Sequence, residues 1–445
     1  MEIKIPLEKI GRIRPRSTDE ITGSMFTLGC EVLDRDFADY DEYKEYLVPL
    51  GIKTIRLQGG WAKCEPAPGK YDFAWLDHIV DDACSRGLNV LLETGYGNPV
   101  YPDGGSRDIA GSFPSSDAAL AAWDRWVEAM ATRYKGKVRD WAMWNEPDLT
   151  RDRPVEQIVD FNIRTAKIIR KIIPDARIGG LSLAFPDLEF DGYIADLERK
   201  GALGLFEWII YHGYQLNPDE AYDRGSRLQK LLARHHPVVK LRQGENGCPS
   251  ERVEKFFAFH DHDWSELSQS KWDLRRFIGD AAHGVETAVF TICDFNHVGR
   301  AINRKGLLLA EADHKVVRPK QAYYAVQHMT SVFDDTLCPV RGKAAVFFPR
   351  NCAAFPFVST EGRGNLLAYW DRSDVPGEAV TPEPADILFR DFAFDDPVLA
   401  DVISGNVYAI PADRIDRQGD FVRFRGMPVI DSPLLIAEKR LLYLE

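Results

Sequence analysis

The sequence predicts an α/β fold, a (β/α)8 TIM barrel with a C-terminal β-sandwich domain. Over about the first three quarters of the chain, strand-like and helix-like segments alternate at intervals of about 30 residues, which is the rhythm of repeated β/α units. The remaining residues form short β-rich runs separated by Gly, Pro and Asp, as in antiparallel strands joined by turns. We therefore predict a barrel over residues 21–332 and a sandwich over residues 333–445.

Eight segments of the barrel region read as strands, and helix-like stretches separate them. Parallel strands connected by helices close naturally into an eight-stranded barrel. The predicted strands are residues 25–31, 54–58, 89–94, 138–144, 177–183, 206–212, 238–244 and 287–293.

The helices between these strands are indicated by apolar residues at three- and four-residue spacing. Leu76, Val80 and Ala83 follow this spacing until Gly87 ends the run. We interpret such apolar stripes as core packing. Two more helices are predicted on the same grounds, at about residues 115–134 and 155–173.

Five strands are predicted in the sandwich region, with a tight hairpin at Ser404-Gly405. Residues 2–10 also alternate like a strand and lie outside the barrel series, so we expect residues 1–20 to join the sandwich. The sequence leaves the oligomeric state open, and a sandwich edge could contribute to a homo-oligomer. The predicted strands are residues 365–370, 397–403, 406–410, 421–427 and 433–439.

Composition and charge restrict the partners of the protein. A net charge of -12 and a pI near 5.4 argue against nucleic acid or an anionic membrane as the main partner. The N-terminus has no apolar core of signal-peptide length, and no run approaches the roughly 20 apolar residues of a membrane span. The seven cysteines are scattered without a C-x-x-C motif, which favours reduced thiols. We therefore expect a cytoplasmic protein.

Two glutamates follow predicted barrel strands, where TIM barrels present catalytic groups. Glu146 lies in Trp-Asn-Glu-Pro after strand 138–144, and Glu245 lies in Gln-Gly-Glu-Asn-Gly after strand 238–244. Cleavage of a glycosidic bond requires one neutral carboxyl that donates a proton and one ionised carboxyl that faces the anomeric carbon. The pair therefore indicates glycoside hydrolysis, with a small carbohydrate as the substrate and no cofactor.

Several motifs resemble those of clan A glycoside hydrolases, and the layout with a C-terminal sandwich looks most like family 39 and its neighbours. The resemblance spans roughly residues 20–330 and, more loosely, the sandwich. The motifs are residues 51–56, Trp61, residues 65–72, Trp-Asn-Glu-Pro at 144–147, His-Gly-Tyr at 212–214 and Glu-Asn-Gly at 245–247.

The expected cytoplasmic location and the long β/α loops, which could close a pocket, favour removal of a terminal sugar from small oligosaccharides or glycosides. The resemblance implies a retaining enzyme that acts by double displacement. Glu146 would be the general acid/base and Glu245 the nucleophile. Asn145 would bond the sugar 2-hydroxyl. A cationic Arg56 beside Glu245 would lower the pKa of the nucleophile, whereas aromatic surroundings and the charge of Glu245 would raise that of Glu146. The resemblance also implies that His212 and Tyr214 surround the nucleophile.

Further substrate-binding candidates follow from their places at strand ends. Trp61 and Trp144 could stack on a sugar ring, although most tryptophans are simply core. Asn98 lies in a loop after the third strand, at the expected catalytic face.

The end of the eighth strand departs from the clan, which often places a tryptophan there. This chain has Asp294, Asn296 and His297 instead. These side chains could bond sugar hydroxyls, and a structural loop is the alternative.

Two other classes of function remain open. A metal-dependent TIM-barrel isomerase or hydrolase is disfavoured because the first strand lacks the His-x-His of a common metallohydrolase type, and we predict no metal. The His-Asp-His-Asp run at residues 260–263 is interpreted as a solvated loop, since four neighbouring residues do not easily converge on one ion. A sugar-binding pseudoenzyme on the same fold is disfavoured because both glutamates are present.

Overall fold

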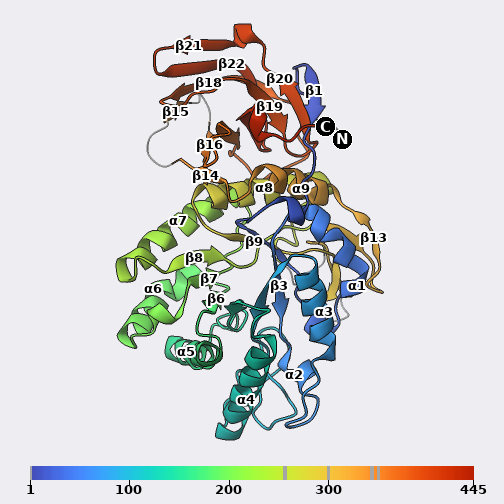
Figure 1. The fold of residues 1–445 in the computed structure, drawn as a ribbon, viewed down its shortest axis with the longest axis vertical. Coiled ribbons are helices and arrows are strands. Elements are labelled where there is room, and N and C mark those ends of the chain that lie inside the picture. Colours follow the sequence, from blue (N-terminus) through green and yellow to red (C-terminus); the bar gives the residue numbers. More distant parts are fainter. Residues whose placement is uncertain (1–2, 254–257, 298–300, 341–344, 348–350) are drawn as a thin grey trace.

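A computed structural model describes residues 3–253, 258–297, 301–340, 345–347 and 351–445, and it confirms the predicted fold class. A barrel of parallel strands surrounded by helices occupies one part of the molecule, and antiparallel sheets occupy the other (Figure 1). Helices α8 (Glu266–Ala282) and α9 (Gln321–Val332) lie between the two parts.

Among the described residues, the barrel consists of eight strands in the order β8-β7-β6-β5-β4-β3-β2-β9, with every neighbouring pair parallel. Isolated parallel bridges from Arg242 to Glu286 and from Asn246 to Val289 join the first and last strands, so the barrel is closed. The strands are β2 (Phe26–Gly29), β3 (Thr54–Gln58), β4 (Asn89–Glu93), β5 (Asp140–Ala142), β6 (Arg177–Leu183), β7 (Trp208–Tyr211), β8 (Lys240–Gln243) and β9 (Thr287–Val289).

Several of the barrel helices begin at a side-chain cap. The Ser116 side chain accepts a hydrogen bond from Ala119 N at the start of α4 (Asp117–Tyr134), and Asn217 caps α7 (Pro218–His235), which has proline in its first turn. Each helix buries an apolar stripe against the barrel. The others are α1 (Tyr40–Tyr43), α2 (Trp61–Cys64), α3 (Ala74–Ser85), α5 (Val155–Ile172) and α6 (Pro186–Arg199).

The C-terminal region contains a seven-stranded sheet, in the order β1-β20-β19-β23-β17-β16-β14, and a four-stranded sheet, β15-β18-β22-β21. The N-terminal strand β1 (Lys9–Arg12) pairs antiparallel with β20 (Asn406–Ala409). The remaining strands are β14 (Leu337–Pro339), β15 (Ala345–Phe347), β16 (Cys352–Ser359), β17 (Asn365–Asp371), β18 (Glu383–Arg390), β19 (Pro397–Asp401), β21 (Ile415–Gln418), β22 (Phe421–Val429) and β23 (Leu434–Glu438).

Two short hairpins follow the eighth barrel strand, where the sequence predicted none. They pair β10 (Phe295–His297) with β11 (Ala301–Asn303) and β12 (Leu308–Ala310) with β13 (Val316–Pro319). The first hairpin brings Phe295 and Asn303 to the wall of a cavity that Glu146 and Glu245 also line.

Helix α8 joins the barrel to the sandwich through buried polar contacts. Lys271 Nζ donates to Asp431 Oδ1 at 2.6 Å and to the Gly377 carbonyl at 2.7 Å. On the neighbouring helix, the Asp219 carboxylate pairs with Arg275 and accepts a hydrogen bond from Trp370 Nε1 at 2.7 Å. These contacts fix the sandwich to the wall of the barrel.

Candidate active site

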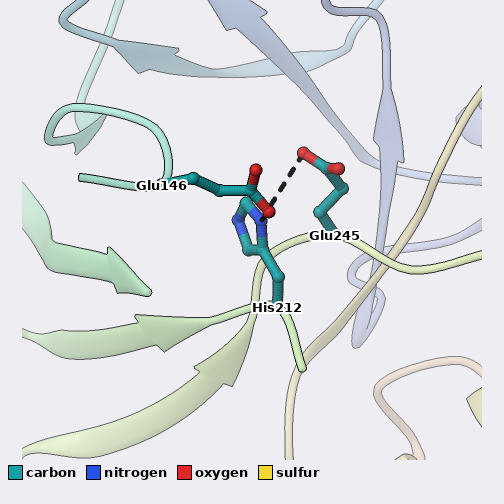
Figure 2. Close-up of side chains that lie close together, drawn as sticks. All are labelled: Glu146, His212 and Glu245. Atoms are coloured by element: carbon teal, nitrogen blue, oxygen red, sulfur yellow. Dashed lines mark hydrogen bonds and ion pairs between the residues drawn. The ribbon is translucent and has the colours of Figure 1, made fainter. Parts of the chain in front are cut away.

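Three side chains meet at the carboxyl ends of the barrel strands. Glu146, His212 and Glu245 follow β5, β7 and β8. His212 Nδ1 lies 2.9 Å from Glu146 Oε1 and 3.7 Å from Glu245 Oε2. Figure 2 shows the two carboxyl groups approaching each other from different strand ends, with the imidazole beside both. One atom from each residue lies within 4.8 Å of the other two.

The backbone around Glu146 is held in an unusual conformation. Its φ of 47° lies in the left-handed region, which a side chain larger than glycine seldom adopts. A bulge in β6 supports it, because Ser182, also left-handed, presents its carbonyl to Glu146 N at 3.0 Å. Asp148 then accepts from Ala184 N and Phe185 N at 2.7 and 2.8 Å. The Glu146 loop is therefore tied to the end of β6.

Arg56, on β3, is fully buried and bonds four side chains at once. Its Nη1 donates to Glu245 Oε2 at 2.9 Å and to Glu31 Oε1 at 2.7 Å. Its Nη2 donates to Glu93 Oε2 at 2.8 Å and to Asn145 Oδ1 at 2.6 Å. A planar guanidinium can serve acceptors from several strands in this way, and it fixes the orientation of Glu245.

Hydrogen bonds complete the positioning of Glu245 and Asn145. Tyr214 donates its hydroxyl to Glu245 Oε1 at 3.0 Å, so both oxygens of this carboxylate are bonded. Asn145 Nδ2 donates to the Tyr96 hydroxyl at 2.9 Å. The amide of Asn145 keeps its second N–H for another acceptor.

The electrostatic environment differs between the two glutamates. Burial opposes ionisation of Glu245, but His212 and Arg56 outweigh burial and lower its pKa below the ordinary value. Burial raises the pKa of Glu146, and the charge of Glu245 raises it further. The hydrogen bond from His212 lowers this pKa but does not outweigh the other two effects. The pKa of His212 is raised despite burial, because Glu245 and Glu146 favour its charged form. The arrangement therefore favours an ionised Glu245 beside a Glu146 that retains a proton more readily.

A cavity of about 520 Å³ opens over these groups. Its size falls within the range of small-molecule sites. Its lining combines carboxylates, basic residues and apolar rings. It includes Glu31, Glu146, Glu245, Tyr214, Lys305, Arg35, Phe185, Phe290 and Phe295.

The two predicted tryptophan platforms lie in the core rather than on the cavity wall. Trp61 is fully buried and packs against Trp123 and Trp126, and its Nε1 donates to Glu65 at 2.6 Å. Trp144 is also buried, with its ring 4.8 Å from that of Phe113. The prediction that they stack on a sugar is wrong, because neighbouring rings cover both indoles.

Asn98 also differs from its predicted role. Its Nδ2 donates to the Glu65 carbonyl at 2.8 Å, and its Oδ1 accepts from Val100 N at 3.1 Å. The side chain is buried and shapes the loop, and it is absent from the cavity lining. The prediction of a sugar contact here is therefore wrong.

Asp294 is likewise structural. It lies buried between Lys320 Nζ at 2.6 Å and Arg304 Nη1 at 3.1 Å, and it does not face the cavity. Its predicted sugar contact is wrong because both of its oxygens belong to this ion pair. Asn296 is partly exposed on β10, and the side chain of His297 lies outside the described residues.

Two carboxylates escaped the sequence analysis. Glu31 and Glu93 lie at or just beyond the ends of β2 and β4, and both bond Arg56. Glu146 and Glu245 were selected because an acidic residue at the end of a barrel strand is a candidate catalytic group, and Glu31 and Glu93 meet the same criterion. Neither stands in a recognisable motif.

The run at residues 260–263 does not gather around an ion. The side chain of Asp263 is 88% exposed and pairs with Arg252. Within the described parts of the chain, the group of three side chains spaced to hold a metal is Glu146, His212 and Glu245. No helix in the same parts is long and apolar enough to cross a bilayer.

Comparison with known proteins supports the N-terminal half of the barrel most directly. Residues 38–153 match the family model of glycoside hydrolase family 42, described as Beta-galactosidase. The chain is 29% identical over 130 residues to Beta-galactosidase BgaA of Clostridium cellulovorans, which is 25% of this chain and 20% of the relative. It is 27% identical over 121 residues to a 6-phospho-beta-glucosidase of Clostridium longisporum, 24% of each. The chain thus spans about a fifth to a quarter of the length of these curated relatives.

Solved structures extend the likeness to nearly the whole chain. A family 39 glycoside hydrolase from Bacteroides cellulosilyticus WH2 aligns with a TM-score of 0.68 at 16% identity, covering 94% of this chain and 81% of that one. The chain has the fold of a clan A glycoside hydrolase. A family 39 enzyme from Xanthomonas axonopodis pv. citri aligns with a TM-score of 0.59 at 14% identity, covering 94% and 95%. The resemblance to clan A drawn from the sequence is therefore confirmed.

Proposed function

We propose that this protein is a retaining glycoside hydrolase that removes a terminal sugar from small oligosaccharides or glycosides. The observation that carries the proposal is the unequal pair of glutamates. Glu245 is held ionised by Arg56 and Tyr214, and Glu146 has a raised pKa. One oxygen of each carboxylate lies within 4.8 Å of the other. This gap favours a retaining pair, because inverting enzymes separate their carboxyl groups by about 6.5–9.5 Å to admit water.

In the first step, Glu245 attacks the anomeric carbon as the glycosidic C–O bond breaks. Glu146 gives its proton to the departing oxygen, and a covalent glycosyl–enzyme forms on Glu245. Because His212 Nδ1 faces Glu146 Oε1, an imidazole ring that carries a proton on Nδ1 leaves the acid proton of Glu146 on Oε2. Asn145 uses its remaining N–H for the sugar 2-hydroxyl.

In the second step, Glu146 is a carboxylate and accepts a proton from water. The water oxygen bonds to the anomeric carbon, the ester bond to Glu245 breaks, and the sugar leaves with its original configuration. Arg56 and Tyr214 stabilise the carboxylate that Glu245 regains. Each group then has the proton with which it began.

The cavity and the names of the relatives support the class of substrate that we propose. A cavity of about 520 Å³ suits one or two sugar rings rather than a polymer groove. The names of the curated relatives, beta-galactosidase and 6-phospho-beta-glucosidase, favour a β-linked pyranose as the released sugar.

Hydrolysis of nitrophenyl glycosides by the wild type and by Glu245→Ala tests the proposal. The panel includes β-galactoside, β-glucoside, β-xyloside and 6-phospho-β-glucoside. We expect turnover of at least one sugar, its loss in the variant, and its rescue by azide as a glycosyl azide of inverted configuration. The matched control is Glu93→Ala, which removes another carboxylate from Arg56 and gives no glycosyl azide.

A wild type that binds the sugars but turns over none of them would contradict hydrolysis and favour the sugar-binding alternative. A product of inverted configuration from the wild type would contradict the retaining mechanism. Both outcomes can be read by NMR of the first product formed.

A further inference from the structure

Glu31 is a carboxyl group of the cavity to which the proposed reaction gives no role. It lies just after β2, is 4% exposed, and lines the cavity with Glu146 and Glu245. Its Oε1 accepts from Arg56 Nη1, the same nitrogen that holds Glu245 Oε2. Because the carboxyl groups of Glu31 and Glu245 accept hydrogen bonds from the same nitrogen, they are neighbours, and a sugar bound at Glu245 lies beside Glu31.

The second oxygen of Glu31 has no partner among the described residues. Oε2 is buried and takes part in no hydrogen bond there. A buried polar atom without a partner is costly, and in a binding site it indicates a contact that the ligand completes. The backbone makes room for this oxygen, because a Cβ on Gly29 would come within 2.4 Å of Oε2. The position of the carboxyl therefore depends on a glycine in β2.

The charges around Glu31 favour its neutral form. Burial raises the pKa of Glu31 to about 7, with Glu245 and Glu93 adding to this effect and Arg56 opposing it. The facing charged groups are Arg56 from β3, Glu93 from β4 and Glu245 after β8, with Arg35 and Lys305 elsewhere on the cavity wall. One guanidinium cannot neutralise three carboxylates.

The position of the proton follows from the hydrogen bonds. Oε1 accepts the N–H of Arg56, so a proton on the Glu31 carboxyl resides on Oε2. Oε2 is then a hydroxyl donor on a side chain that lines the cavity. A carboxyl that merely balanced Arg56 would need neither the proton nor a place on the cavity wall.

We propose that Glu31 determines substrate specificity by donating a hydrogen bond from Oε2 to one hydroxyl oxygen of the sugar that Glu245 attacks. This inference rests on the proposed function and names the feature of the substrate that the site demands. The sugar must carry an oxygen at that position. A site built around such a bond rejects the deoxy analogue, because the buried donor is then left without an acceptor.

The test compares Glu31→Ala, Glu31→Gln and Glu93→Gln on a glycoside that the wild type cleaves and on its set of monodeoxy analogues. In Glu31→Ala we expect kcat/KM for the parent to fall by about 10- to 100-fold. For one deoxy analogue it should change by less than about threefold, because that analogue lacks the partner oxygen. Glu31→Gln keeps an acceptor for Arg56 and a donor for the sugar, so it should stay within about threefold of the wild type on the parent.

Glu93→Gln is the matched control. It also replaces a carboxyl group that bonds Arg56 by an amide, but both Glu93 oxygens are bonded inside the barrel, to Arg56 and Gln58. Any effect it has should be equal for the parent and the deoxy glycosides. The pH dependence adds a second readout. As the pH rises above about 7, wild-type KM should increase because Glu31 loses its proton, and KM of Glu31→Gln should not.

An equal loss by Glu31→Ala on every deoxy analogue would overturn the proposal, and so would a Glu31→Gln variant as impaired as Glu31→Ala. Neither result touches the azide rescue of Glu245→Ala, so the two proposals fail separately. If the wild type hydrolyses nothing, calorimetric binding of the free monosaccharide and its deoxy forms replaces kcat/KM. The same selective loss in Glu31→Ala is then expected, and its absence overturns the proposal.

Discussion

Replacing Tyr214 by phenylalanine removes one hydrogen bond to the proposed nucleophile and leaves the rest of the site in place. The hydroxyl lies 3.0 Å from Glu245 Oε1, and the other oxygen of Glu245 still accepts from Arg56 at 2.9 Å. The ring keeps its edge contact with Phe259, at 5.8 Å between centroids, and lies 5.6 Å from Lys305 Nζ. The substitution therefore isolates the phenol–carboxylate bond.

The size of the effect follows from the charge of the acceptor. A hydrogen bond to an ionised group contributes about 1.5–3 kcal/mol, which corresponds to about 10- to 150-fold in rate. Tyr214 is partly exposed on the cavity wall, so water can replace some of the lost bond, and we expect about 10- to 30-fold in kcat/KM. The bond also helps to lower the pKa of Glu245. Its loss raises that pKa, so the acid limb of the pH profile moves to higher pH.

The assay is kcat/KM against pH for the best nitrophenyl glycoside, together with the urea midpoint of each protein. The control is Tyr222→Phe, which removes a similar hydrogen bond. The Tyr222 hydroxyl donates it to Asp219 Oδ1 at 2.5 Å, at the junction with the sandwich. The control should lower the urea midpoint without moving the acid limb. A Tyr214→Phe profile that superimposes on the wild type would refute the reasoning.

Three further outcomes are expected. Asp294→Ala removes the carboxylate partner of Lys320, whose side chain is 0% exposed, so the free energy of unfolding in urea should fall by about 3–5 kcal/mol. The kcat/KM of the folded enzyme should change by less than about threefold. Trp61→Ala leaves a cavity beside Trp123 and Trp126, so the free energy of unfolding should fall by about 3–5 kcal/mol while KM stays unchanged. A rise in KM would instead indicate that Trp61 contacts the sugar. Zinc should inhibit by binding Glu146, His212 and Glu245, and EDTA should restore activity; loss of activity on adding EDTA alone would instead favour a metal-dependent enzyme.

The barrel was predictable because its strands are buried and apolar. The predicted segments 54–58 and 177–183 coincide with β3 and β6. The hairpins after β9 escaped prediction because their strands are only three or four residues long, and three of the four mix apolar with polar side chains. Strand β18 alternates in burial but begins with a glutamate and a proline, which weaken the strand signal.

The gathering of Glu146, His212, Glu245 and Arg56 at one face follows from strand order alone, since parallel strands present their carboxyl ends together. Which side chains reach the cavity does not follow from strand order. Trp61 lies in a one-turn helix that α4 covers. Both Trp61 and Glu245 follow barrel strands, but Glu245 lines the cavity whereas the Trp61 indole is packed in the core. The position of a residue in the sequence therefore predicts at which end of the barrel it lies, whereas packing decides whether its side chain points into the cavity or into the core.

Helix α8 has a consequence for how the chain folds as it is synthesised. Each residue from Leu267 to Ala281 is buried, including the charged Lys271. A barrel helix normally turns one face to solvent, but this one needs the sandwich, and the carboxylate that pairs with Lys271 lies 160 residues later in the chain. A nascent chain that has completed its eight barrel strands still lacks Asp431, so the buried Lys271 has no carboxylate partner until that part of the sandwich has been made. The barrel therefore acquires its full stability only once the sandwich has been synthesised, so the two domains mature as one unit.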